Sequence, residues 1–310
     1  MRAIVVENQQ LKIAEAPDPQ LQPGDLLVEV KAAGVNRADL LQRMGRYPPP
    51  KGESEIIGLE IAGDVVEPAQ RRGERVMALL AGGGYAALAR VPAAQAMPIP
   101  RGLDYAQAAA IPEAFLTAWL NLFMIGGLKA GENVVVHAGA SGVGSAALQL
   151  CHGVAGMLLA TSSPEKEAAC RSLGASHWLA REDVPKKLHE AIQADVILDT
   201  VGGAYLEANV NALRLHGRLC CISTMSGAKA TLDLGQLLYK RLSVLGSTLR
   251  SRTAPQKAKL VRDFSAKALP RFDTGDLHPV LARTLRFSEA MAAHEALEKG
   301  EVVGKIVLIP

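Results

Sequence analysis

The residues best suited to chemistry form a short glycine-rich turn. Against the pattern GxGxxG, the turn keeps the first and third glycines as Gly139 and Gly144. Ser141 stands in place of the second glycine and is followed by Gly142 and Val143. An apolar run precedes the turn and a helical pattern follows it, which is the context that a dinucleotide site requires. The free N–H groups of that helix, together with the Ser141 hydroxyl, would then hold a diphosphate.

The end of the next predicted strand indicates which dinucleotide to expect. NAD-binding versions of this motif usually place Asp or Glu there to hold the ribose hydroxyls. Here residues 159–163 read Leu-Ala-Thr-Ser-Ser, and the first carboxylate is Glu165, already inside the following helix. Hydroxyl groups such as that of Ser162, with Lys166 one turn further on, suit a 2′-phosphate, although Ser163 would equally serve as a helix N-cap. We therefore expect NADPH rather than NADH.

Alternating strands and helices must position this turn. The strands that we expect after about residue 130 are 133–137, 157–160, 195–199, 218–222 and 243–247, with a helix at 204–215 among the intervening helical patterns. At this spacing, strands and helices predict βαβ units and a parallel sheet. A tight turn without a ligand would need the same glycines, but the four βα steps that follow favour a nucleotide site.

The first hundred residues follow a different pattern. Short strand-like runs at 3–6, 26–30 and 61–66 are separated by turns rich in Pro and Gly, which predicts a compact, mostly β domain. The tail returns to a helical pattern at about 255–269 and ends in a strand-like run at 304–309. The sequence therefore predicts an α/β chain in which a parallel-sheet region follows a mostly β region.

Composition and charge limit the classes of partner. The 310 residues are 49% hydrophobic and 21% charged, as in ordinary globular proteins with a core. The net charge of +3 is small and the basic residues are scattered, which argues against nucleic acid as the main partner. The N-terminus becomes charged too soon for a signal peptide, and Pro112 and Glu113 interrupt the apolar stretch 106–128. We therefore expect a cytoplasmic protein with a buried helix from about Ala114 and no membrane contact.

The sequence offers no metal site. Its four cysteines include no CxxC pair and no spacing typical of a zinc site, so we expect reduced thiols. The seven histidines are scattered, and no HExxH motif is present.

Further motifs lie along the whole chain. Besides the glycine turn, they are Asn36-Arg-Ala-Asp39, Arg43-Met-Gly-Arg-Tyr47-Pro, Gly58-Leu-Glu60-Ile-Ala-Gly63, Ile111-Pro-Glu113-Ala-Phe-Leu-Thr117-Ala, Asp199-Thr-Val-Gly202-Gly203, Leu249-Arg-Ser-Arg252 and Gly304-Lys-Ile-Val-Leu308. Each motif alone is a modest signal, but their order and spacing together are specific. With these motifs, the chain resembles the zinc-free quinone oxidoreductases of the medium-chain dehydrogenase/reductase superfamily, related to zeta-crystallin.

The resemblance implies a fold and the absence of zinc. It implies a Rossmann-type parallel-sheet domain, residues 116–249, inserted in a mostly β, GroES-like catalytic domain, residues 1–115 and 250–310. It also implies a cofactor cleft between the domains and a homodimer formed through the Rossmann sheets. Where zinc-dependent relatives have a cysteine ligand and a histidine ligand, this chain has Asn36 and Leu59. Because a metal site needs three or four ligands, zinc chemistry is not expected.

The resemblance further implies direct hydride transfer from NADPH to a quinone. The cofactor carries the hydride, while the protein orients it and stabilises the developing oxyanion. A quinone needs no Lewis acid because it becomes aromatic on reduction. Tyr47 and Asn36 are the candidate catalytic residues, with the Tyr47 hydroxyl beside the nicotinamide and able to donate a hydrogen bond or a proton. Tyr47 could instead pack for shape, and Asn36 could instead cap a turn.

Further cofactor contacts follow from the same resemblance. Thr117 is similar to a residue that contacts the nicotinamide carboxamide, and Glu113 either lines the same cleft or pairs with a helix N-terminus. Arg181 stands near the place where many relatives have a cofactor-binding tyrosine and would substitute for it. The other expected contacts, after predicted strands or at the domain crossover, are Gly202, Ser223, Met225, Leu249, Arg250 and Arg252. For the two arginines, solvation at the surface is the alternative.

Two other functions stay open at this point. The same hydride would serve reduction of enoyl or other α,β-unsaturated carbonyl compounds, with a proton donor that the sequence does not locate. The second alternative is a non-catalytic nucleotide-binding relative, of RNA-binding or lens-structural type, against which the small net charge argues.

Overall fold

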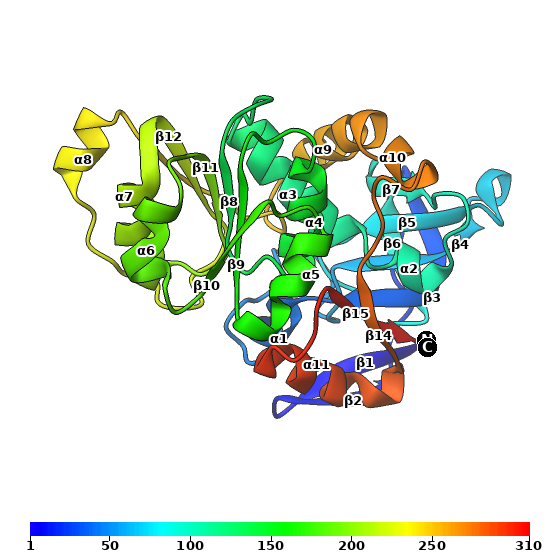
Figure 1. Cartoon of the computed structure of the whole chain (residues 1–310). Helices are drawn as coiled ribbons and strands as arrows, with labels where there is room; N and C mark the ends of the chain where they lie inside the picture. Colours follow the sequence, from blue (N-terminus) through cyan, green and yellow to red (C-terminus); the bar gives the residue numbers. More distant parts are fainter. The chain divides into compact units, whose positions relative to one another are not determined.

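The single chain folds into two compact units. The computed structural model describes residues 1–310. The first unit, which we call the β unit, consists of Met1–Leu116 and Leu249–Pro310. The second, the Rossmann unit, consists of Thr117–Thr248, so it is inserted in the sequence of the β unit. Figure 1 shows both units, coloured from the N-terminus to the C-terminus.

A six-stranded, fully parallel sheet forms the centre of the Rossmann unit, in the order β10-β9-β8-β11-β12-β13. The strands are β8 (Val134–Val136), β9 (Leu158–Ser162), β10 (His177–Ala180), β11 (Ala194–Asp199), β12 (Leu213–Cys221) and β13 (Ser243–Gly246). β8, β9 and β11 are buried throughout, as expected for strands covered on both faces. The strand order reverses between β8 and β11, and open parallel sheets bind ligands at such a point, beyond the carboxyl ends of the strands.

Helices cover both faces of this sheet. They are α4 (Gly142–Cys151), α5 (Glu167–Ser172), α6 (Val184–Ala191), α7 (Leu206–Ala212) and α8 (Leu234–Tyr239), with 3-10 turns at Pro164–Lys166 and Gly203–Tyr205 and a π-helical segment at Leu120–Ile125. In Figure 1, α4 and α5 lie on one face and α6 and α7 on the other. The alternation of strands and helices positions the glycine turn between β8 and α4.

The β unit contains a mostly antiparallel sheet in the order β14-β15-β3-β4-β5-β7, with β6 paired to β3, and a separate hairpin β1-β2. The strands are β1 (Arg2–Glu7), β2 (Gln10–Glu15), β3 (Asp25–Val35), β4 (Glu60–Glu67), β5 (Arg75–Leu79), β6 (Leu88–Pro92), β7 (Ala96–Pro98), β14 (Leu281–Arg286) and β15 (Lys305–Ile309). The final strand β15 pairs antiparallel with β3 from the start of the chain, Ile306 opposite Val35. The tail is therefore integral to this sheet.

Short helices surround that sheet. They are α1 (Arg37–Arg43), α2 (Tyr105–Ala108), α9 (Ala254–Lys267), α10 (Pro270–Asp273) and α11 (Ala290–Lys299), with 3-10 turns at Ala69–Arg71, Ala93–Gln95 and Phe287–Glu289; α3 (Pro112–Trp119) runs across the boundary of the two units. Aliphatic residues of β3, β4 and β15 form the core together with Tyr85 and Phe287. The two sheets confirm the predicted class: an α/β chain with a parallel-sheet domain inserted in a mostly β domain.

The structure differs from the sequence-based prediction in both units. In the β unit it adds β2, β5, β6 and β7 to the three strands predicted in the first hundred residues. The helix predicted at 204–215 is too long, since α7 ends at Ala212 and Leu213 already pairs with Ala194 in the sheet. The predicted strand series also lacks β10, which occupies His177–Ala180 and leaves Arg181 as the first residue after it. By length and composition alone, the helical stretch Tyr105–Ile125 could span a membrane, but 78% of its most apolar window is buried by the protein itself.

Candidate active site

The glycine turn of the Rossmann unit opens helix α4. Ser141 is the N-cap residue, and its Oγ accepts a hydrogen bond of 3.0 Å from the Gly144 N–H. A Cβ atom on Gly144 would lie 2.2 Å from the carbonyl oxygen of Ala138, so only glycine allows this close approach of helix and strand. The N–H groups of Gly142 and Val143 belong to the first helical turn and therefore have no intrahelical acceptor. These two partly exposed N–H groups, with the Ser141 hydroxyl proton, suit the oxygens of a diphosphate.

Four of the residues predicted to bind a cofactor lie with this turn at the carboxyl edge of the parallel sheet. Ser162 ends β9, Arg181 follows β10, Gly202 follows β11 and Ser223 follows β12. Gly202 has a φ of +94°, and a Cβ atom there would lie 2.9 Å from the Ser223 carbonyl oxygen, so the last two loops are in close contact. Thr117 is buried and Met225 is exposed. The sheet thus brings residues from separate βα units to one edge.

Just after β9, polar groups surround the carboxylate of Glu165. Ser162 Oγ accepts a 2.8 Å hydrogen bond from Trp178 Nε1 and donates to the Ser163 carbonyl, so its hydroxyl proton is already used. The Ser163 hydroxyl instead donates to the carboxylate of Glu165. That hydrogen bond lowers the pKa of Glu165, and the charges of Lys166 and Arg181 lower it further. The groups at this edge therefore favour the charged form of the Glu165 carboxylate.

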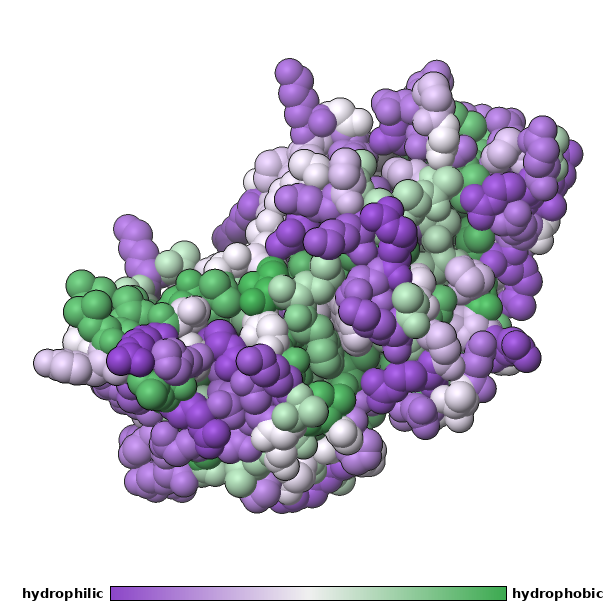
Figure 2. Space-filling model, turned by 90° about the horizontal axis from the view of Figure 1, so that it is seen from above, coloured by the Kyte–Doolittle hydropathy of each residue, from purple (hydrophilic) through white to green (hydrophobic).

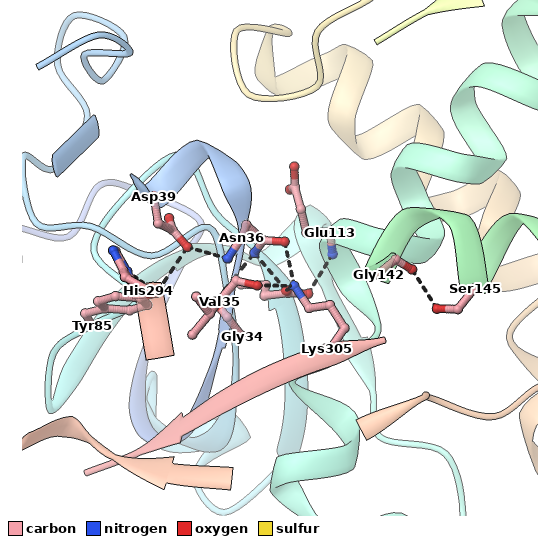
Figure 3. Close-up of polar contacts among 11 residues, drawn as sticks. Gly34, Val35, Asn36, Asp39, Tyr85, Glu113, Gly142, Ser145, His294 and Lys305 are labelled. Carbon is pink, nitrogen blue, oxygen red and sulfur yellow. Dashed lines mark hydrogen bonds and ion pairs between the residues drawn. The ribbon is translucent and has the colours of Figure 1, made fainter. Parts of the chain in front are cut away.

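The β unit contains a buried network around an ion pair (Figure 3). Lys305 Nζ lies 2.6 Å from Glu60 Oε1 and donates to the Val35 carbonyl (2.7 Å) and to Asn36 Oδ1 (2.5 Å). Asn36 Nδ2 donates to Glu60 Oε1 (2.9 Å), and the Glu113 N–H donates to Glu60 Oε2 (2.8 Å). The Lys305 and Glu60 side chains are only 5% and 0% exposed. All three ammonium protons therefore have acceptors, as a buried charge requires.

This network continues behind Asn36 towards α11. Asp39 Oδ2 accepts hydrogen bonds from the Asn36 N–H (2.7 Å) and from the Tyr85 hydroxyl (3.1 Å), which lies 3.3 Å from His294 Nε2. Burial raises the pKa of Asp39 to about 7, although the hydrogen bond from Asn36 opposes this rise. Burial lowers the pKa of His294 to about 3, so that its ring is neutral at physiological pH. The geometry makes Asp39 the group that fixes the backbone of Asn36.

Glu113, in the first turn of α3, is the second carboxyl group with a strongly raised pKa. Burial, and then the negative charge of Glu60, raises the pKa of its carboxyl group to about 8. The Glu113 residue nevertheless keeps partial exposure to solvent. A carboxyl group that is protonated at neutral pH and still accessible is typical of functional sites.

Tyr47, the predicted catalytic tyrosine, is held in place by Arg250. The guanidinium carbon lies 5.2 Å from the centre of the Tyr47 ring, and Nη1 donates to the Tyr47 carbonyl (3.0 Å). The other two nitrogens donate to the Ala81 carbonyl and to Gln42 Oε1, both at 2.7 Å. Arg250 is only 4% exposed, so solvation at the surface is the wrong alternative for it. Its nitrogens all bind the β unit, which makes Arg250 a support for the Tyr47 loop.

Comparisons with known proteins give matches in both the β unit and the Rossmann unit. Residues 22–101 match the family model described as alcohol dehydrogenase GroES-like domain, and residues 142–266 match the one described as zinc-binding dehydrogenase. A quinone oxidoreductase from Thermus thermophilus, whose structures include a complex with NADPH, is 32% identical, with a TM-score of 0.85 and 100% of each chain covered. The chain belongs to the medium-chain dehydrogenase/reductase superfamily of oxidoreductases.

Two curated relatives are similar to this chain over nearly its whole length. The human synaptic vesicle membrane protein VAT-1 homolog is 28% identical over 97% of this chain and 82% of its own length. The spectinabilin polyketide synthase system protein NorB of Streptomyces orinoci is 32% identical over 94% of this chain, which spans only 14% of NorB. Similarity to such large proteins therefore concerns one part of them.

Several residues of this dehydrogenase/reductase site escape prediction from the sequence alone. Lys305 and Glu60 occur within recognisable motifs, but nothing in the pattern pairs them. Leu249 and Arg252, by contrast, are among the predicted cofactor contacts. Leu249 is buried, and Arg252 is half-buried with an Nε that has no hydrogen-bond partner. No group of three or more His, Cys, Asp or Glu side chains is arranged to hold a metal ion, and all four cysteines are unpaired.

Proposed function

We propose that this protein is an NADPH-dependent quinone oxidoreductase that works without zinc. The observation that carries the proposal is the end-to-end likeness to the Thermus quinone oxidoreductase, together with a turn in this chain whose geometry suits a diphosphate. The proposal concerns the chain by itself, whatever assembly it works in.

The residues at the carboxyl edge of the Rossmann sheet fit a dinucleotide. The N–H groups of Gly142 and Val143 would bind the diphosphate, and the lack of side chains at Gly144 and Gly202 allows the close backbone packing that shapes this edge. Support for the 2′-phosphate of NADPH comes from Lys166, near Glu165 at the end of β9, and from Arg181 beyond β10. The NADPH complex of the Thermus protein points to the same cofactor.

Independence from zinc is supported by what surrounds Asn36. The oxygens of Asn36 and Glu60, which would be the nearest hard ligands, already bind the ammonium group of Lys305. An internal cation thus takes the oxygens that a metal ion would need, and Leu59 offers no ligand atom.

When bound, NADPH would supply a hydride, and the side chains of the β unit would prepare the acceptor. The Tyr47 hydroxyl is available for a hydrogen bond to a quinone oxygen, since Arg250 holds the Tyr47 backbone and ring but not its hydroxyl. Such a bond strengthens as negative charge develops on that oxygen, which is how hydrogen-bond donors lower a barrier.

A panel of quinones and enones, each tested with NADPH and with NADH, tests this proposal. We expect turnover with quinones and a preference for NADPH. Turnover of enones alone would favour the α,β-unsaturated carbonyl reductase, in which the same hydride reaches carbon. Cofactor binding without turnover of any compound, together with salt-dependent affinity for RNA, would favour a non-catalytic relative.

We further propose that two copies associate through the edge strand β13. Strand β13 has a neighbour on one side only, and exposed apolar side chains gather around it and α8; a hydrophobic patch at that end is visible at the left of Figure 2. The side chains are Leu215, Leu234, Leu238, Tyr239 and Val244, which are 39% to 87% exposed. Such a patch marks an interaction site, and pairing would complete the sheet. Sedimentation should show a dimer that Leu238→Asp weakens, whereas a monomeric wild type would refute this.

A further inference from the structure

The carboxyl group of Glu113 is held in position but bound to nothing. Its backbone N–H donates to Glu60 Oε2 at 2.8 Å, and Glu60 is itself fixed by Lys305 and Asn36. The side chain makes no hydrogen bond or ion pair of its own, and Figure 3 shows it pointing away from Asn36 and Lys305. A buried network therefore anchors the start of α3 while leaving one carboxyl group free for another partner.

We propose that Glu113 is the general acid of the reaction and gives its proton to the oxyanion that hydride transfer creates on the substrate. This proposal rests on the proposed function, because it assigns the proton that quinone reduction requires.

The charges around Glu113 decide its protonation state. Groups that interact electrostatically with it come from every element packed nearby, namely Glu60 (β4), Asp39 (α1), Lys305 (β15), Lys257 (α9), Tyr47 and Arg250. Burial is the largest influence, the negative charge of Glu60 is next, and together they outweigh the two lysines, so the pKa is about 8. Glu113 is accordingly a neutral acid at pH 7, and its pKa lies near the working pH, where proton transfer is most effective.

The Tyr47 hydroxyl is the other candidate proton donor, and its pKa distinguishes it from Glu113. Burial raises the pKa of the Tyr47 hydroxyl above its ordinary value of 10, whereas that of Glu113 is about 8. Glu113 is thus the stronger acid by two or more powers of ten. We therefore assign hydrogen-bond donation to Tyr47 and proton donation to Glu113.

The proposed step is balanced in protons and electrons. When bound, NADPH would supply a hydride, whose two electrons would form an O–H bond at one quinone oxygen while the nicotinamide is oxidised. The second oxygen becomes a phenolate as the ring becomes aromatic. The O–H bond of Glu113 then breaks, its proton forms the second hydroquinone O–H bond, and the carboxylate left behind is reprotonated from water.

Glu113→Gln is the direct test, because glutamine keeps the size and polarity of the side chain but cannot release a proton. With NADPH and 1,4-benzoquinone, or cyclohexenone as the enone, kcat of E113Q should fall about 100-fold at pH 7. In the wild type, kcat should be level at low pH and fall as the pH rises through about 8, and E113Q should lack this limb. E113D should recover part of the rate together with the limb, and Tyr47→Phe should keep the limb.

Two further measurements separate catalysis from structure. The affinity for NADPH should not change in E113Q. The melting temperature of the wild type should fall relative to E113Q between pH 6 and 9, since only the wild type must ionise a buried carboxyl group. Glu207→Gln is the matched control, because Glu207 is also a first-turn glutamate but is exposed and belongs to α7.

Three results would overturn the role proposed for Glu113. Wild-type turnover combined with an E113Q rate and pH profile like those of the wild type would overturn the role of Glu113 and leave the proposed function intact. An equal loss in E113Q and E113D with no change in the pH profile, or a loss of NADPH affinity, would make Glu113 structural. Wild-type protein that binds NADPH but reduces neither class of substrate would overturn the proposed function and this proposal with it.

Discussion

Substitution of Asp39 by asparagine should change how the stability of the β unit depends on pH. Asp39 is fully buried, and its Oδ2 accepts hydrogen bonds from the Asn36 N–H and the Tyr85 hydroxyl, while its Oδ1 has no partner. An asparagine side chain can place its oxygen where Oδ2 lies and keep both hydrogen bonds. Because asparagine cannot ionise, D39N removes the pH dependence that Asp39 contributes and keeps the packing around the side chain.

The size of the effect follows from the pKa of Asp39. Burial raises this pKa from 3.8 to about 7, so the folded protein holds the proton more tightly than the unfolded chain. The resulting stability is fully present below pH 3.8 and is lost as the pH rises through about 7. At 1.36 kcal/mol for each pKa unit, the loss is at most about 4 kcal/mol. Since interiors relax around a charge, we expect about 2–4 kcal/mol.

Urea unfolding followed by circular dichroism at pH 5, 6, 7 and 8 measures this effect. The free energy of unfolding of D39N, relative to the wild type, should rise from pH 5 to about pH 7 and then level off, with unchanged m values. Asp104→Asn is the control, since Asp104 also closes a capping box in the β unit but is exposed. A D39N difference that is constant within about 0.5 kcal/mol, or that equals the D104N difference, would refute the argument that Asp39 is a buried acid titrating near pH 7.

Three further substitutions test other parts of the structure. Lys305→Met should cost about 3–5 kcal/mol in urea unfolding because Glu60 is left as a buried, unpaired charge, and a second change, Glu60→Gln, should restore most of it. Gly144→Ala should cost about 3 kcal/mol or more and abolish NADPH binding measured by fluorescence, because its Cβ would meet the Ala138 carbonyl. Lys166→Ala should weaken NADPH more than NADH in the same assay; equal losses would contradict a 2′-phosphate site.

Much of the Rossmann unit could be predicted because its signals are local. The apolar runs and the glycine turn place β8, α4 and β9 within a few residues, since each depends only on its own periodicity and caps. The end of α7 could not be placed in this way. Leu213 and Leu215 continue an apolar pattern that suits a helix, and only pairing with Ala194 of β11 shows that Leu213 belongs to a strand.

The buried network of the β unit could not be predicted, for a different reason. Lys305 and Asn36 are 269 residues apart and meet only because β15 pairs with β3. A lysine at the start of an apolar strand is ordinarily expected to reach solvent. Its burial becomes favourable only when Val35, Asn36 and Glu60 supply three acceptors, and no single segment contains that information.

The Lys305–Glu60 pair links the stability of the β unit to its proposed chemistry. Glu60 Oε2 accepts a hydrogen bond from the Glu113 N–H, and this bond fixes the first turn of α3. An isolated carboxylate in that position would be costly, and Lys305 compensates for it. The positive charge of Lys305 also lowers the pKa of Glu113, against the raising effects of burial and Glu60. One ion pair therefore holds the acid in place and keeps its pKa within reach of neutral pH, which is why a buried lysine belongs in a site without metal ligands.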